Sequence, residues 1–406
     1  MRSSFLIVLV HVLVGCGGDP EPAPPPVEPQ AVRGQPIDLE PLAEFDVGFV
    51  REALDEAGLG ELAPVETGVS LARLSYTTVD EYGAPTWASG LLAMPLDLSP
   101  RALISYQHGT ITDRADAPSM GEGDESLLVA ALFAGHGFAY LAPDYLGLGT
   151  GPGLHPYMHA ASEATATLDL IRAAGSPELE GSGLALDLSM PSLLVGFSQG
   201  AHASLAALRA SDSESERALG NLPDVTAVAA IAGPHALSDV QIPHSLDATT
   251  GGGPVYLGYL ISAYQRIYDG PALSEAVRAP YASRLPELFD GSQGETVAEE
   301  LPTTGAELVI PELATALRNG GDNWLARALA DNDLLGWIPN RPVVLYVGRA
   351  DVDVPAENSE RAVEVWRARG ASVELVELGP VDHSASAALG LVAARARFDT
   401  MLRERG

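Results

Sequence analysis

The feature that most constrains the fold is a series of short, almost uninterrupted apolar runs, each followed within two residues by Gly, Pro or a polar residue. These runs occupy residues 102–107, 138–142, 191–195, 225–231, 341–347 and 372–378, after two earlier strand-like segments at 69–80 and 85–95. Helical patterns lie between them at 125–135, 158–174, 199–210, 357–369 and 385–404. Strands that are apolar throughout and alternate with helices are typical of a mostly parallel sheet covered on both faces. The sequence therefore predicts an α/β fold with its chemistry at the carboxyl ends of the strands.

One long stretch, from about residue 238 to 339, contains no clean strand and only helical patterns, at 254–267, 272–289 and 305–330. An insertion of this length is too long for a structureless loop. We expect a helical cap over the strand ends at 238–339, inserted into a core formed by 37–237 and 340–406. The alternative is a separate helical domain without a catalytic role.

The N-terminus has the features of an export signal rather than of the fold. Arg2 precedes an apolar stretch, Phe5–Val14, that is about half as long as a membrane span. It leads to Cys16, the single cysteine, in a sequence that resembles a bacterial lipobox. We therefore predict a signal peptide at 1–15, lipidation of Cys16 and a Pro-rich tether at 16–36. An ordinary signal peptide that happens to contain Cys is the alternative.

These features predict an exported protein that is anchored by lipid to the bacterial cell envelope, or is secreted. Gly17 carries no obvious inner-membrane retention signal, which favours the outer membrane. A lone cysteine also excludes an intramolecular disulfide.

Composition narrows the class of partners. The chain is 46% hydrophobic and 19% charged, as in a packed globular enzyme, and its net charge is −31. Such an excess of acid argues against nucleic acid as a partner, because few basic groups could neutralise phosphates. His155 and His159 lie four residues apart but without a partner Glu or Cys cluster, and are expected at a pocket edge or the surface. No metal or other cofactor is expected.

The nucleophile candidate is Ser198, at the centre of the pentapeptide Gly196–Gly200. The pattern Gly-x-Ser-x-Gly is weak alone, but here an apolar strand precedes it and a helical pattern follows it, as a nucleophile elbow requires. A second Ser-Gln-Gly occurs in the sequence 291–294 (GSQG), but it lacks the Gly-x-Ser-x-Gly spacing and has no strand before it. The alternative role for Ser198 is a helix N-cap.

A catalytic serine needs a base and an acid that orients the base. In folds with a nucleophile elbow, these residues follow along the chain in the order Ser, acid, His. We expect His383 to be the base because it follows a strand and precedes the last helix. His235 also follows a strand but precedes the cap, so we expect it to line the pocket or bind loop backbone. Asp351 has the better spacing for the acid, whereas Asp353 is expected to cap the helix near Pro355. Asp353 remains the alternative acid.

Two backbone donors are needed to stabilise the oxyanion of an acyl-transfer reaction. Gln199, directly after the nucleophile, supplies the first. The second is expected from the loop His108-Gly109-Thr110, most simply the amide of Thr110. His108 is expected to hold this loop through hydrogen bonds.

Four segments together resemble the secretory lipase family of α/β-hydrolases: 106–110 (YQHGT), 142–147 (APDYLG), the region from 155–157 (HPY) to the helix at 168–172 (LDLIR), and 196–200 (GFSQG). The resemblance covers roughly residues 65–404 and implies an α/β-hydrolase fold. It also implies lipase or carboxylesterase activity, with a cap that shapes an acyl-chain site. The triad that the family pattern implies is the same Ser198, Asp351 and His383. Further candidates for contact with substrate are His108, Tyr145 and His235.

The function expected from these residues is hydrolysis of carboxylic esters, triacylglycerols among them, through an acyl-enzyme on Ser198. The substrate would be an ester or lipid, and the membrane would be reached through the lipid anchor. A peptidase or acyltransferase on the same fold is one alternative. A lipid-anchored binding protein on a degenerate hydrolase scaffold is another.

Overall fold

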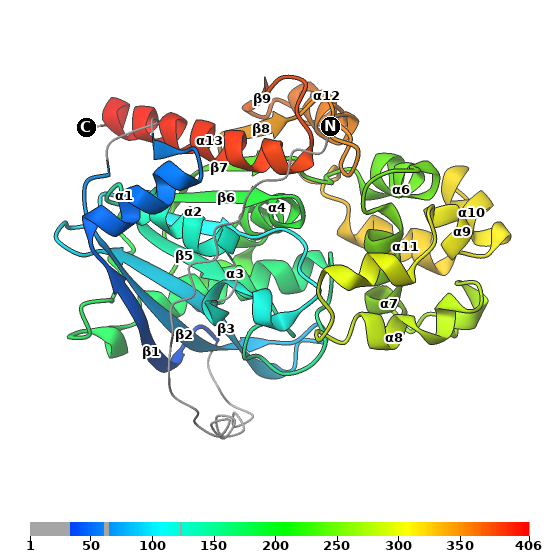
Figure 1. The fold of residues 1–406 in the computed structure, drawn as a ribbon, viewed down its shortest axis with the longest axis horizontal. Coiled ribbons are helices and arrows are strands. Elements are labelled where there is room, and N and C mark those ends of the chain that lie inside the picture. The colour runs from blue at the N-terminus through cyan, green and yellow to red at the C-terminus, as the bar shows by residue number, and fades with distance from the viewer. Residues whose placement is uncertain (1–32, 61–64, 122–123, 406) are drawn as a thin grey trace.

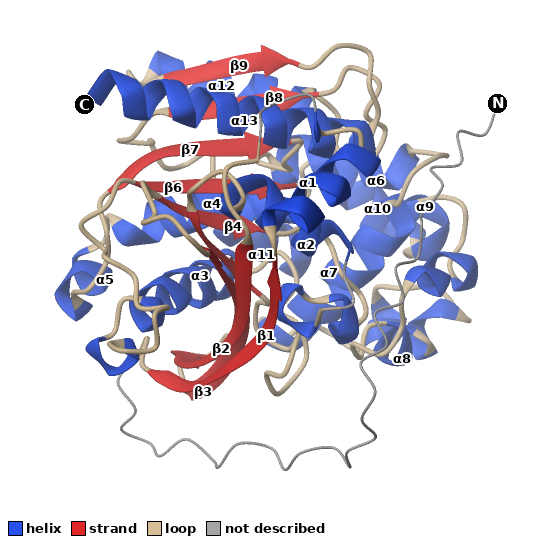
Figure 2. Cartoon of the chain, turned by 60° about the vertical axis from the view of Figure 1, so that its left-hand side comes forward, coloured by secondary structure: helices blue, strands red, loops and turns tan. Residues whose placement is uncertain are grey.

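The computed structural model describes residues 33–60, 65–121 and 124–405. Nine strands form one sheet in the order β1-β2-β3-β5-β4-β6-β7-β8-β9. The strands are β1 (Pro36–Phe45), β2 (Val69–Val79), β3 (Pro85–Pro95), β4 (Leu103–Gln107), β5 (Ala139–Pro143), β6 (Ser192–Phe197), β7 (Val225–Ile231), β8 (Val343–Val347) and β9 (Val373–Glu377). The pairs from β5 to β9 are parallel, and β1, β2 and β3 add antiparallel pairs at one edge. This confirms the predicted mostly parallel sheet, whose twist is visible in Figure 2.

Helices cover both faces of the sheet. Those outside the cap are α1 (Val47–Glu56), α2 (Asp124–Ala134), α3 (Ala160–Ala174), α4 (Gln199–Ser211), α5 (Glu214–Leu219), α12 (Glu357–Ala368) and α13 (His383–Arg405). Apolar side chains of α3, α4 and α12 pack on one face, and those of α1, α2 and α13 pack on the other. Burial on both faces is the physical reason for the uninterrupted apolar runs in the sequence.

Six helices between β7 and β8 form the cap, at the right of Figure 1. They are α6 (Ile242–Asp247), α7 (Gly253–Ile267), α8 (Leu285–Leu288), α9 (Gly305–Leu308), α10 (Pro311–Arg318) and α11 (Trp324–Asn332). The cap has its own apolar cluster, which also takes in Tyr157 and Met158 from the core. The continuous helices expected at 272–289 and 305–330 are wrong. Prolines at 280, 286 and 311 and the glycines at 320–321 divide these segments into short helices and turns.

The N-terminal boundary of the core also differs from the expectation. The tether was expected to run to residue 36, but Arg33 already binds the core through Asp169 (2.8 Å) and Glu216 (2.8 Å). Strand β1, which follows at once, was not predicted. The predicted signal peptide and Cys16 lie outside the described residues. Across residues 33–60, 65–121 and 124–405, no helix is long and apolar enough to cross a membrane.

Candidate active site

Ser198 lies in the sharp turn between strand β6 and helix α4. Its backbone angles are φ 55° and ψ −121°, a conformation that costs a non-glycine residue about 1–3 kcal/mol. A Cβ atom at Gly196 would lie 2.0 Å from the Gly200 carbonyl oxygen, and one at Gly200 would lie 1.8 Å from the Gln107 carbonyl oxygen. Only glycine therefore fits at both positions of the Gly-x-Ser-x-Gly pattern. The turn places the hydroxyl at the N-terminus of α4, where the helix dipole favours negative charge.

His383 and Asp351 continue a line of hydrogen bonds that starts at Ser198. The Ser198 Oγ lies 3.0 Å from His383 Nε2, and His383 Nδ1 lies 2.7 Å from Asp351 Oδ2. Asp351 Oδ1 accepts hydrogen bonds of 2.9 Å from the amides of Asp353 and Val354. The carboxylate is thus held in place and orients the imidazole. A nucleophile, a base and an orienting acid in this geometry can perform acyl transfer.

Asp353, the alternative acid, has a different set of partners. Its Oδ1 accepts hydrogen bonds from the Gly252 amide (2.6 Å) and the Tyr256 hydroxyl (3.2 Å), both in the cap. Its expected role as a helix cap is wrong, because α12 begins at Glu357 and has Ala356 at its N-cap position. The carboxylate instead ties the cap to the loop that carries Asp351. No local pattern indicates this role, because the partners lie about a hundred positions upstream.

The two amides expected to stabilise an oxyanion flank the nucleophile. In the described part of the chain, neither the Gln199 nor the Thr110 amide has a hydrogen-bond acceptor. The Thr110 loop passes directly beside the serine, since a Cβ at Gly109 would lie 3.6 Å from Ser198 Cβ. The Thr110 hydroxyl is fixed by Tyr157, at 2.8 Å. Both amides are therefore free to bind a negatively charged oxygen.

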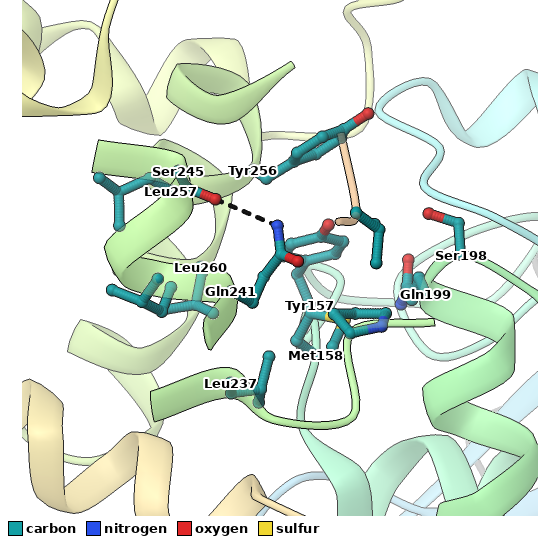
Figure 3. Close-up of a pocket in the computed structure, with 13 residues that line it drawn as sticks. Tyr157, Met158, Ser198, Gln199, Leu237, Gln241, Ser245, Tyr256, Leu257 and Leu260 are labelled. Atoms are coloured by element: carbon teal, nitrogen blue, oxygen red, sulfur yellow. Dashed lines mark hydrogen bonds between the residues drawn. The ribbon is translucent and has the colours of Figure 1, made fainter. Parts of the chain in front are cut away.

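Two hollows meet at Ser198. The inner pocket is narrow, with a cavity volume of about 30 Å³. It is bordered mainly by apolar cap residues, Leu237, Ile242, Leu257 and Leu260, and by Tyr157 and Tyr256 (Figure 3). The outer groove, of about 440 Å³, is more polar and is bordered by Thr110, Thr112, Asp116, Gly252, Val297 and His383. Tyr256 and Ser198 border both hollows. The cap thus contributes side chains to the walls of both hollows.

A buried polar network beneath α4 was not predicted. Glu163, on α3, is 1% exposed and binds the Gln199 side chain (3.0 Å) and His202 Nδ1 (2.7 Å). His155 also contacts the Gln199 side chain, at 2.9 Å. His155 borders a further pocket beside the cap, so its expected position at a pocket edge is confirmed. The surface position is wrong for both histidines, because both are buried, and His159 Nδ1 lies 3.0 Å from Ser162 Oγ. The one signal in the sequence was that Glu163 is the single charged residue in the first half of this helix, residues 160–167.

The three further candidates for substrate contact, His108, Tyr145 and His235, are each at most 1% exposed, and none borders the inner pocket or the outer groove. His108 holds its loop, as expected, with Nδ1 2.7 Å from the Gly109 carbonyl oxygen. The Tyr145 hydroxyl donates to the His108 carbonyl oxygen at 3.2 Å. Among the described residues, neither ring nitrogen of His235 has a partner, so it does not bind loop backbone either. The positions of these three residues therefore give no support to the expectation that they contact substrate.

Burial of His235 has a consequence for stability at acid pH. Burial lowers the pKa of His235 to about 3, whereas an unfolded histidine has a pKa of about 6.5. The unfolded state therefore binds more protons below pH 6.5, and stability is lost as the pH falls. Between pH 7.5 and 4.5 this residue should account for a loss of about 2–3 kcal/mol.

The measurement is the free energy of unfolding in urea at several pH values for the wild type and His235→Leu. Between pH 7.5 and 4.5, the free energy of unfolding of the wild type should fall by about 2–3 kcal/mol more than that of the variant. Trp366→Phe, which alters the neighbouring buried ring without removing a titratable group, should shift the curve equally at every pH. Parallel curves for the wild type and His235→Leu would show that His235 is not kept neutral by burial.

Comparison with known proteins agrees with this architecture. A family profile described as secretory lipase matches residues 113–401. A protein of Legionella pneumophila, described only as a candidate hydrolase, has a TM-score of 0.82 at 25% identity, over 91% of this chain and 98% of its own. The rice cell wall degrading esterase LipA from Xanthomonas oryzae has a TM-score of 0.77 at 26% identity, over 92% of this chain and 98% of its own. Candida antarctica lipase A in its closed state, at 18% identity, shares the fold, with a TM-score of 0.66 over 92% of this chain and 83% of its own. A search of curated proteins gave no match.

Proposed function

The chain belongs to the secretory lipase family and is an ester hydrolase, and we propose that it cleaves carboxylic esters through an acyl-enzyme on Ser198. The observation that carries the proposal is the line of hydrogen bonds from Ser198 Oγ through His383 to Asp351, at 3.0 and 2.7 Å. A serine hydroxyl is a weak nucleophile until a positioned base removes its proton. The base here is itself oriented by a buried carboxylate.

In the proposed mechanism, Ser198 Oγ attacks the ester carbonyl carbon while its proton passes to His383 Nε2. The negative charge on the carbonyl oxygen is stabilised by the amides of Gln199 and Thr110. Collapse of the tetrahedral intermediate expels the alcohol, which takes the proton from His383. Water then attacks the acyl-enzyme while its proton passes to His383, the bond from the acyl carbon to Ser198 Oγ breaks, and His383 returns the proton to Oγ as the acid is released. Asp351 stabilises the imidazolium in both halves of the reaction.

The two hollows support a division of the substrate between them. The inner pocket is bordered by apolar side chains and suits the acyl chain, because burial of apolar surface favours binding. The outer groove is wider and more polar and suits the alcohol, which must leave before water enters. Ser198 at their junction would face the carbonyl carbon of an ester that spans both.

The test combines turnover with covalent labelling. We expect the purified protein to hydrolyse p-nitrophenyl esters and to react with a fluorophosphonate probe, with the probe mapped to the peptide that contains Ser198. A folded protein that hydrolyses no ester and leaves Ser198 unlabelled would favour the binding-protein alternative. Peptide anilides, and esters offered with an acceptor alcohol, separate a peptidase and an acyltransferase from an esterase.

Membership of a secretory family also suggests export. We extend the proposal to attachment of the exported chain to the cell envelope through lipidated Cys16. Incorporation of labelled palmitate into the wild type but not into Cys16→Ala would support the anchor. Absence of label from the wild type would rule it out.

A further inference from the structure

The side-chain amide of Gln199 carries an acceptor that the proposed mechanism does not use. Gln199 is 1% exposed, and its Oε1 has no hydrogen-bond partner among the described residues. The side chain borders the inner pocket next to Ser198 (Figure 3). A buried acceptor without a partner costs free energy, so its presence at a substrate pocket calls for a partner on the substrate.

The orientation of this amide is set by its neighbours. The Gln199 Nε2 lies 3.0 Å from Glu163 Oε1, an acceptor, and 2.9 Å from His155 Nε2. His155 Nδ1 lies 2.9 Å from the Leu146 carbonyl oxygen, so the ring proton is on Nδ1 and Nε2 is also an acceptor. Burial lowers the pKa of His155, which keeps the ring neutral. The reversed amide would place its oxygen against two acceptors, so the oxygen must occupy the other position.

The remaining polar side chains of the inner pocket already have partners within the protein. Gln241 donates to Ser245 Oγ (3.2 Å) and to the Asp353 carbonyl oxygen (2.9 Å), and its Oε1 accepts from Asn358 (2.9 Å). The hydroxyl groups of Tyr157 and Tyr256 are bound to Thr110 and Asp353. Of the described side chains that border this pocket, Gln199 alone offers an unmatched acceptor.

From this we infer the substrate class, resting on the proposed function: the inner pocket takes acyl groups that bear a hydroxyl on the α- or β-carbon, and that hydroxyl donates to Gln199 Oε1. Gln199 directly follows the nucleophile, so a donor that reaches its side chain must lie close to the carbonyl carbon. The rest of an acyl chain would contact the apolar wall formed by Leu237, Leu257 and Leu260.

The inference predicts discrimination between a hydroxyl and an ether at the same carbon. A site with a buried acceptor disfavours an analogue that cannot donate, because the acceptor is then left unpaired. We expect kcat/KM for p-nitrophenyl 2- or 3-hydroxybutyrate to exceed that for the corresponding methoxybutyrate by about tenfold to a hundredfold. Unsubstituted butyrate should resemble the methoxy ester.

Gln199→Met tests the residue, because it keeps the backbone amide and the side-chain length but removes the acceptor. In this variant the ratio of hydroxy to methoxy ester should fall to about one to twofold, after the intrinsic reactivity of each ester is divided out. Gln265→Met, which removes a cap side-chain amide that donates to the Gly270 carbonyl oxygen and borders neither the inner pocket nor the outer groove, is the matched control and should keep the wild-type ratio. Should Gln199→Met fail to fold, the wild-type ratio alone decides.

Two outcomes would overturn the inference. One is a wild-type ratio near one for both the α- and the β-hydroxy ester, with butyrate hydrolysed normally. The other is a folded Gln199→Met variant that keeps the wild-type ratio. If the protein hydrolyses none of these esters, the proposed function is wrong, and the inference that rests on it is wrong as well.

Discussion

Replacing Ser198 with Ala should lower kcat for p-nitrophenyl butyrate by about 10⁴–10⁶-fold, because no other group can form the acyl-enzyme. The remaining turnover would come from the oxyanion donors and from binding, which the substitution leaves in place. The variant should fold, since Ala is smaller than Ser at a buried position and no backbone contact of the elbow depends on the hydroxyl. The measurement is steady-state kinetics together with circular dichroism.

Ser292→Ala is the control for this variant. Ser292 lies in the cap sequence 291–294, which repeats Ser-Gln-Gly, but its hydroxyl donates to Asp290 at 2.6 Å, and Ser292 borders neither the inner pocket nor the outer groove. We expect its kcat to equal that of the wild type. A folded Ser198→Ala protein with normal turnover would exclude Ser198 as the nucleophile.

The second large effect is expected from Asp351→Asn. The backbone amides of Asp353 and Val354 bind Asp351 Oδ1 and would hold the Asn oxygen in the same place, so its NH₂ group would face His383 Nδ1. That contact favours the tautomer with the proton on Nε2, which cannot accept the proton of Ser198. A loss of about 10⁴-fold in kcat is the usual result of such a change.

Asp353→Asn tests whether Asp351 or Asp353, the two carboxylates of this turn, is the orienting acid. Because Asp353 contacts Gly252 and Tyr256 rather than the imidazole, we expect its loss in kcat to be at most about tenfold, well below the loss expected for the orienting acid. Equal losses in the two variants, with both folded, would contradict the assignment of Asp351 as the acid.

The central strands could be predicted because burial on both faces imposes a composition that is visible locally. Strand β7 occupies Val225–Ile231, the same bounds as the apolar run. Strand β1 was missed because it lies at the sheet edge, pairs only with β2 and carries acidic and proline residues. The cap helices were merged because helical periodicity continues across prolines that end each helix.

In the candidate site, too, the residues with a local sequence signal could be predicted, whereas contacts made only by tertiary packing could not. Ser198, Asp351 and His383 could be proposed together because the fold dictates their order and each follows a recognisable strand. The contacts of Glu163 with Gln199 and of Asp353 with Tyr256 join residues that are 36 and 97 positions apart. Such contacts depend on how α3 packs on α4 and how the cap meets β8, which no local pattern encodes. The same holds for the burial of His235.

The attachment of the cap at Asp353 bears on how selectivity in this family could be exchanged by engineering. His244 Nε2 lies 2.8 Å from the Val352 carbonyl oxygen, so with Gln241, Gly252 and Tyr256 four cap residues contact the two positions that follow Asp351. A chimaera that received a foreign cap without matching residues at these four positions would disturb the turn that orients its own base. A cap should therefore be transferred together with the turn at 351–354 from the same parent protein, so that the contacts between them are kept.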